Sequence, residues 1–160
     1  MIIVSDTSPI ANLILINRLD LIRAVFEEVI IPPAVEKEII ALENIGYDLS
    51  DYKNATWISV KIPSDIQAVA DLHQDLDLGE SEAIVLAKEV NADLLLIDER
   101  LGTNQARKIG LETVGLLGVL IKAKEAEIIP EVMPIVEELE KVGFWISRKV
   151  KNMVKQQVKE

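Results

Sequence analysis

Short runs of aliphatic residues alternate along the chain with longer stretches of helical periodicity, and this alternation is the strongest constraint on the fold. Consecutive apolar residues predict buried strands at 1–5, 29–31 and 94–97, with a shorter strand at 112–114. The alternating segment 57–62 predicts an edge or half-buried strand. Strands separated by helices are joined by right-handed crossovers. We therefore expect a three-layer α/β/α fold around a central parallel sheet of four to five strands.

The 160 residues fit a single domain, and an apolar fraction of 49% supplies a core and excludes a disordered chain. We expect a catalytic body at 1–142 and a basic C-terminal helix at 143–160 that belongs to the same domain. The apolar start at 1–4 is too short for a signal segment, and no apolar run approaches the ~20 residues that span a bilayer. These features predict a cytoplasmic protein with no membrane partner.

The charge is strongly acidic and unevenly spread. The net charge is −10, yet residues 141–160 carry +5, so the rest of the chain carries −15. This balance argues against a broad DNA-binding surface. The absence of cysteine excludes disulfides, thiolate metal sites and cysteine nucleophiles, and a single histidine, His73, excludes sites that need two.

Five acidic residues occupy positions that a parallel sheet would bring to one edge. Asp6 follows the first strand and Asp98 the strand at 94–97, while Glu38 lies on the helix after the second strand. Glu80 and Glu82 fall in the first turn of a later helix, which we expect to begin at Gly79. Function in such sheets gathers at the carboxyl ends of the strands.

Taken singly, each acid has a structural explanation. An Asp after a strand is often a helix N-cap, and a Glu in a first helical turn stabilises the helix dipole by about 0.3–1 kcal/mol. Converging carboxylates, however, repel one another unless a cation compensates. Carboxylates without cysteine or paired histidine favour Mg²⁺ or Mn²⁺. The pattern therefore predicts metal-assisted hydrolysis of a phosphodiester or phosphomonoester.

Four segments, in this order, resemble motifs of the PIN-domain family, and more narrowly PIN-like proteins close to the VapC-type toxins of toxin–antitoxin systems. The segments are VSDTSPIANL, IIPPAVEKEI, LGESEAIVLA and LLLIDER. The resemblance implies a ribonuclease that depends on Mg²⁺ or Mn²⁺ and carries a quartet of acids. It also implies a homodimer and a partner antitoxin whose basic residues enter the acidic groove.

Matched to the family pattern, Asp6, Glu38 and Asp98 are the first, second and fourth acids. The third is Glu82, with Glu80 as a competitor. Asp6 and Asp98 would be the principal metal ligands, with Glu82 binding directly or through a water molecule. Glu38 would orient the attacking water or help to hold a second ion.

Two further residues are candidates for contact with substrate. Ser8 matches the family's hydroxyl near the first acid, and the sequence also allows it to be a helix N-cap, with Pro9 at the first helical position. Arg100 is placed to meet a substrate phosphate, or else to form a surface ion pair with Glu99 or another neighbour.

Other interpretations remain open for the site and for the tail. A phosphomonoesterase or phosphoacceptor domain also places an acid after the first strand, and a catalytically silent PIN-like binding module is the third alternative.

In the tail, Lys151, Lys155 and Lys159 share a helix face that would reach RNA phosphates or simply be solvated. The opposite stripe, Val150 to Val158, would pack on a second subunit.

Overall fold

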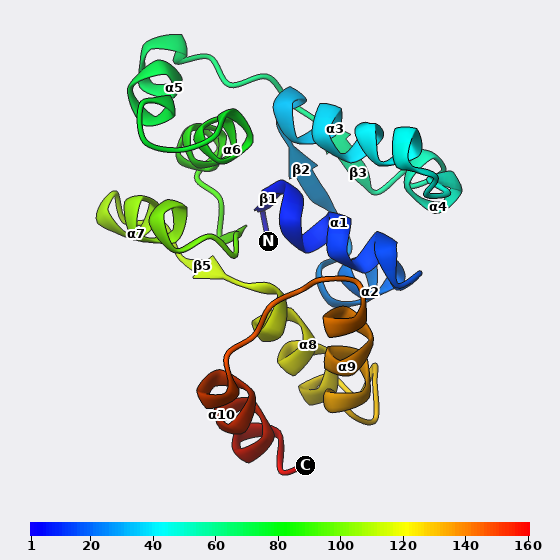
Figure 1. The fold of residues 1–160 in the computed structure, drawn as a ribbon. Coiled ribbons are helices and arrows are strands. Elements are labelled where there is room, and N and C mark those ends of the chain that lie inside the picture. Colours follow the sequence, from blue (N-terminus) through cyan, green and yellow to red (C-terminus); the bar gives the residue numbers. More distant parts are fainter.

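The structure, a computed structural model, describes residues 1–160 and contains one parallel sheet of five strands in the order β3-β2-β1-β4-β5 (Figure 1). The strands are β1 (Ile3–Ser5), β2 (Val29–Ile31), β3 (Ile58–Val60), β4 (Leu94–Leu96) and β5 (Thr113–Val114). The central strand β1 pairs with β2 and β4, and Ser5 lies beside Leu96. The predicted α/β fold is confirmed, and the alternating segment 57–62 supplies the edge strand β3.

Ten α-helices and one 3-10 helix connect and cover the strands. They are α1 (Thr7–Leu15), α2 (Asp20–Phe26), α3 (Pro33–Ile40), η1 (Ala41–Ile45), α4 (Ser50–Lys53), α5 (Ile66–His73), α6 (Leu78–Glu89), α7 (Arg100–Lys108), α8 (Leu116–Glu125), α9 (Met133–Lys141) and α10 (Arg148–Val158). In Figure 1, α5, α6 and α7 lie on one side of the sheet, and α1, α2, α8 and α9 lie on the other. None of the helices has the length and apolar character needed to cross a bilayer.

Alternation along the strands divides the core between the two faces of the sheet, because successive side chains point to opposite faces. Val4 and its register partner Leu95 pack with α6 in a cluster of 10 buried residues. Ile3 and Leu96 point the other way, into a cluster of 26 buried residues shared with α1, α2, α8 and α9. The packed sheet thus holds the ends of β1 and β4 side by side.

The observed start of α1 excludes one of the two roles that the sequence allows for Ser8, that of helix N-cap. The helix begins at Thr7, and Asp6 is its N-cap, with extended backbone at φ −76° and ψ 175°. Ser8 is therefore the second helical residue rather than the N-cap, and Pro9 is the third rather than the first. The reason is that the chain turns directly out of β1, so the helix starts two residues earlier than a proline at the first helical position would place it.

The C-terminal helix α10 packs its valine stripe on its own chain. Val154 and Val158 are buried in the larger core cluster, and Val150 is 39% exposed. On the neighbouring face, Lys151 Nζ lies 2.7 Å from a carboxylate oxygen of Glu140. Most of the stripe is therefore used inside the molecule and is not free to pack on a second subunit.

The side chain of Glu160, which follows α10, forms hydrogen bonds with the start of α9. Its carboxylate accepts hydrogen bonds from the backbone N–H groups of Val132 and Met133, with donor–acceptor distances of 2.8 and 2.9 Å. It also accepts one from Lys124 Nζ at 2.7 Å. Because Val132, the N-cap of α9, has no capping side chain, Glu160 supplies that cap from a distant part of the chain.

Glu160→Ala should lower the free energy of unfolding by about 1 kcal/mol, the usual effect of losing an N-cap. The measurement is urea denaturation followed by circular dichroism. The matched control is Glu138→Ala, which removes the same charge from an exposed position on α9 itself. Equal effects of the two substitutions would contradict a capping role and indicate a general effect of charge.

Candidate active site

Two aspartates meet at the carboxyl edge of the sheet, as the sequence predicts. Asp6 directly follows β1, and Asp98 comes two residues after β4. The two strands are held in register up to this edge, since the Asp6 backbone N–H donates to the Leu96 carbonyl oxygen at 2.8 Å. The pairing of β1 with β4 therefore brings together two acids that lie far apart in the sequence.

Asp6 is an N-cap by backbone position, but its side chain makes no capping hydrogen bond. The residue is only 4% exposed. The pKa of Asp6 is raised to about 7, mainly by burial, with smaller contributions from the charges of Asp77, Glu38 and Asp98 and against a lowering by the Thr7 backbone N–H. A buried carboxyl group that caps nothing is poorly explained by helix stability alone.

Asp98 is held by hydrogen bonds to both of its oxygens. Oδ1 accepts from the Leu116 backbone N–H at 2.8 Å, and Oδ2 accepts from the Ser8 hydroxyl at 3.3 Å. Burial raises the pKa of Asp98, and these two donors lower it. Gly115 makes the approach possible, because a Cβ there would lie 2.8 Å from Oδ1.

Glu38 reaches the same edge from α3. It accepts a hydrogen bond from the Thr7 hydroxyl, and burial raises the pKa of Glu38. Its carboxylate lies over Gly79, where a Cβ would be 3.0 Å from Oε1. A glycine near the start of α6 therefore allows the second predicted acid to sit against that helix.

Glu80 has a buried carboxylate oxygen that the structure leaves without a hydrogen-bond partner. The helix α6 begins at Leu78, not at Gly79 as expected, because the side chain of Asp77 caps it by accepting the Glu80 backbone N–H at 2.8 Å. In a capping box the Glu side chain would return a hydrogen bond to the N-cap backbone. Instead Glu80 Oε2 is buried and has no hydrogen-bond partner.

The surroundings of Glu80 explain its raised pKa. Its carboxylate lies close to α7, where a Cβ on Gly102 would be 2.5 Å from Oε2. The pKa of Glu80 is raised to about 8, mainly by burial and in part by a hydrogen bond with Asp77 and by the charges of Asp77 and Asp6. Asp77, which the sequence reasoning missed, therefore belongs to the same group of acids. The pattern Asp77-x-x-Glu80 is a readable capping signal that would have indicated it.

Glu82 has a different environment. Its Oε1 accepts the Ala34 backbone N–H at 3.2 Å, so Glu82 helps to cap α3 from outside that helix. It also borders an open, mainly apolar hollow of about 330 Å³. The other residues that line this hollow are Pro33, Ile62, Pro63, Ile66 and Val69.

Arg100 is the first residue of α7, is exposed and forms no ion pair with Glu99 or any other acid.

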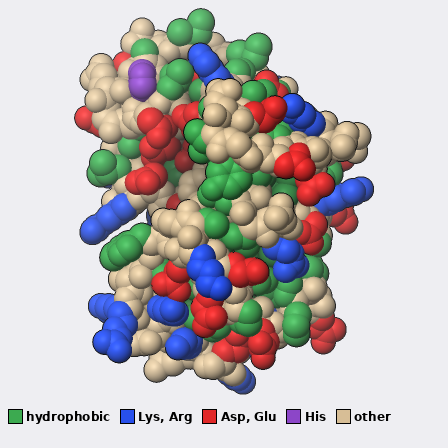
Figure 2. All heavy atoms as spheres, turned by 45° about the vertical axis from the view of Figure 1, so that its right-hand side comes forward, with side chains coloured by type: hydrophobic (Ala, Val, Ile, Leu, Met, Phe, Trp, Pro, Cys, Tyr) green, Lys and Arg blue, Asp and Glu red, His purple; other side chains and the backbone are tan.

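Figure 2 shows Asp and Glu side chains gathered below the single histidine, His73, and Lys and Arg side chains gathered at the lower left. Over the rest of this face, acidic and basic side chains lie next to one another.

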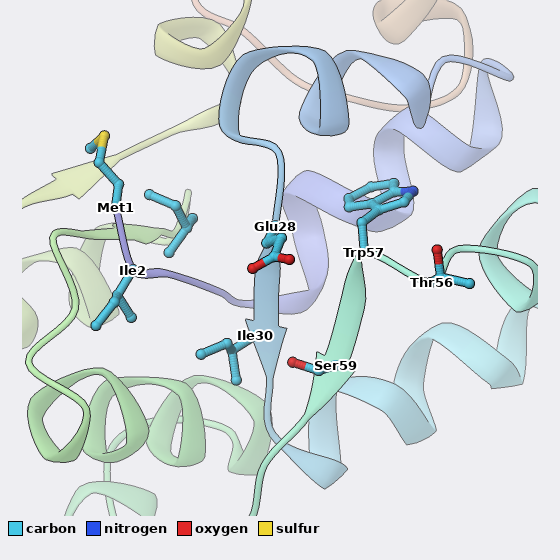
Figure 3. A pocket seen from close by; sticks show the side chains of 8 residues that line it. Met1, Ile2, Glu28, Ile30, Thr56, Trp57 and Ser59 are labelled. Carbon is cyan, nitrogen blue, oxygen red and sulfur yellow. The ribbon is translucent and has the colours of Figure 1, made fainter.

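A second hollow, at the opposite edge of the sheet, lacks comparable chemistry. It measures about 220 Å³ and lies where β1, β2 and β3 begin (Figure 3). Glu28 is its one acidic residue, and most of the lining is hydrophobic. The other lining residues are Met1, Ile2, Ile3, Ile30, Thr56, Trp57 and Ser59. The carboxyl edge is therefore the better candidate for an active site.

The donors at the carboxyl edge suit a hard divalent cation. The donors are the carboxylate oxygens of Asp6, Glu38, Glu80 and Asp98, the type of ligand that such cations prefer. Burial and neighbouring charges raise the pKa values of these four groups, and one buried oxygen of Glu80 has no hydrogen-bond partner. No three acids converge closely enough to form a ligand cluster in this arrangement. A cation would stabilise the charged forms of these groups and draw them together.

Comparison with known proteins agrees with this architecture. A PilT N-terminus domain protein from the hyperthermophilic archaeon Sulfolobus solfataricus P2 superposes with a TM-score of 0.55 over 77% of this chain and 93% of that chain. At 21% sequence identity, the likeness shows a shared fold alone. No curated protein matches the chain in sequence. The family described as DUF3368, a PIN domain, matches residues 2–160, and the chain therefore belongs to the PIN-domain family.

Proposed function

We propose that the protein is a metal-dependent endoribonuclease that hydrolyses RNA phosphodiester bonds and acts as the toxin of a toxin–antitoxin pair. PIN-domain proteins are typically nucleases. The observation that carries the proposal is the buried Glu80 oxygen without a hydrogen-bond partner, placed among acids whose pKa values are raised. Such a group destabilises the folded chain by itself, and a bound cation would compensate for it.

Mg²⁺ or Mn²⁺ is the proposed cofactor. When bound, the ion supplies an activated water molecule and stabilises the charge on the leaving oxygen. Asp6 and Asp98 are its proposed principal ligands, because they are fixed at the ends of adjacent strands. Glu38, held by the Thr7 hydroxyl, is the proposed group that orients the attacking water.

For the third acid we propose Glu80 in preference to Glu82. Both were candidates from the sequence, but their surroundings differ. Glu82 already accepts a backbone hydrogen bond at the start of α3, so a structural role accounts for it. Glu80 has an unsatisfied oxygen and interacts with the charge of Asp6.

An acidic protein needs local features to hold a polyanion. The cation would neutralise part of the acidic edge, and Arg100 is an exposed charge without an ion-pair partner at the start of α7. We propose that Arg100 contacts a substrate phosphate. The cations of α10 are a weaker candidate, since Lys151 is paired with Glu140.

An antitoxin and a homodimer remain proposals that rest on the family resemblance. An antitoxin with basic residues suits the acidic edge, because opposite charges would replace the cation's role in reducing repulsion. For a homodimer, the buried valines of α10 are not the contact surface, so another face of the molecule must supply it.

The decisive assay is cleavage of single-stranded RNA with added Mg²⁺ or Mn²⁺, with EDTA as the control. Metal-dependent endonucleolytic products support the proposal. Hydrolysis of a phosphomonoester without RNA cleavage would favour the phosphatase alternative. RNA binding without cleavage by any added metal would favour a silent binding module.

Glu80→Gln and Asp98→Asn should each reduce metal-dependent RNA cleavage at least about 100-fold, because each removes a negative charge from the metal site. Glu82→Gln is the matched control, since its amide oxygen can still accept the Ala34 N–H. It should retain most of the activity. If Glu82→Gln is the inactive variant and Glu80→Gln is not, the assignment of the third acid is wrong.

Asp6→Asn should abolish cleavage and leave the metal-free stability unchanged or raised. The substitution removes a buried charge that repels its neighbours, and no side-chain cap is lost. The measurements are thermal unfolding in EDTA and the RNA assay. A markedly less stable variant whose activity follows its folded fraction would instead support a structural role for Asp6.

The metal-free protein should become less stable as the pH rises from about 5 to 8. The pKa values of Asp6 and Glu80 rise from 3.8 and 4.5 to about 7 and about 8, so over this range the folded chain binds more protons than the unfolded chain. A loss of several degrees in Tm is expected, since about 1 kcal/mol corresponds to roughly 2–4 °C at this size.

This pH dependence is measured by thermal unfolding in EDTA. Glu80→Gln should flatten it, whereas Glu138→Gln, at an exposed position, should not. Saturating Mn²⁺ should also flatten it, because the cation favours the charged carboxylates at every pH. A Tm that is constant or rises over this range in EDTA would contradict the burial of protonated acids.

A further inference from the structure

The orientation of Asp98 depends on a serine hydroxyl that has only one proton to give. Asp98 Oδ1 is fixed by the Leu116 N–H, and the second oxygen, Oδ2, is contacted by the Ser8 hydroxyl at 3.3 Å. A hydroxyl donates one hydrogen bond and accepts up to two. Ser8 therefore helps Asp98 only when its proton points toward the carboxylate and not toward another acceptor.

Asn12 determines the direction of that proton. It lies one turn after Ser8 on α1, and its Nδ2 is 3.0 Å from the Ser8 backbone oxygen and 3.0 Å from Ser8 Oγ. A backbone carbonyl oxygen can only accept, so the Asn12 group facing it is the NH₂ group. The same NH₂ group then donates to Ser8 Oγ, which leaves the Ser8 proton free for Asp98.

We infer that Asn12 is a positioning residue of the metal site, acting through Ser8 to hold the Asp98 carboxylate in the orientation that binds the cation. The chain Asn12–Ser8–Asp98 runs in one direction, from amide donor to hydroxyl to carboxylate. Groups that orient metal ligands in this way commonly alter metal affinity by 10- to 100-fold. The inference rests on the metal site of the proposed function, but not on RNA as the substrate.

A purely structural role for Asn12 is the alternative. Its bond to the carbonyl four residues earlier could simply stabilise the first turns of α1, independently of Ser8. The two roles differ in one respect. A positioning role requires the Ser8 hydroxyl, whereas a structural role does not.

A double-mutant cycle on Asn12→Leu and Ser8→Ala distinguishes the two roles, with Mn²⁺ affinity measured by isothermal titration calorimetry on the full chain. Each single substitution should weaken Mn²⁺ binding about tenfold. Asn12→Leu should cause little further loss when Ser8→Ala is already present, because the hydroxyl through which it acts is gone. Asn104→Leu, on the exposed face of α7, is the control and should leave the affinity unchanged.

Thermal unfolding in EDTA accompanies each variant, so that loss of fold is separated from loss of metal binding. Additive effects of the two substitutions on Mn²⁺ affinity would overturn the inference, and so would a stability loss in Asn12→Leu without a change in affinity. Absence of Mn²⁺ binding by the unchanged protein would overturn it as well. Mn²⁺ binding with the expected cycle but no RNA cleavage would reject only the proposed ribonuclease function.

Discussion

The carboxyl edge of the sheet depends on holding several carboxyl groups together in a place that is largely closed to water. Burial is the main cause of the raised pKa values of Asp6, Glu80 and Asp98, and neighbouring charges add to it. Without a cation, the fold accommodates these groups by protonation and by a few hydrogen bonds from the backbone and from hydroxyl groups. The same conditions that make the site unfavourable when it is charged make it suitable for a divalent cation. Stability and the proposed metal binding therefore depend on one set of side chains.

Helix starts and glycines make this crowding possible. Asp98 accepts a backbone N–H at the start of α8, and Glu38 lies against the start of α6, where the helix dipole favours negative charge. Gly79, Gly102 and Gly115 each leave space that a Cβ would fill against a carboxylate. These glycines act by permitting close approach and not by unusual backbone angles. The sequence motifs around the acids thus contain the residues that make room for them as well as the acids themselves.

The two glutamates of α6 show how neighbouring residues of one helix are given different tasks. Glu82 points toward α3 and satisfies a backbone N–H there, whereas Glu80 points toward α7 and one of its oxygens is left without a partner. From the sequence Glu82 was the expected third acid and Glu80 its competitor, because spacing along a helix does not show what the neighbouring helices present. Ser8 is a similar case. Its expected N-cap role is taken by the backbone position of Asp6, and its hydroxyl is instead used on Asp98.

The sequence by itself determined the fold class, the strand positions and the presence of Asp6 and Asp98 at one edge. These follow from local periodicity and from the rule that parallel strands end at the same edge. It did not identify Asp77, did not show how the surroundings of Glu80 and Glu82 differ, and did not reveal the link from Asn12 through Ser8 to Asp98. Only the tertiary structure decided these points, because hydrogen-bond partners and burial are set by contacts between segments far apart in the chain. For the same reason, the valines of α10 could be recognised as one stripe in the sequence, but only the packed chain shows what they bury.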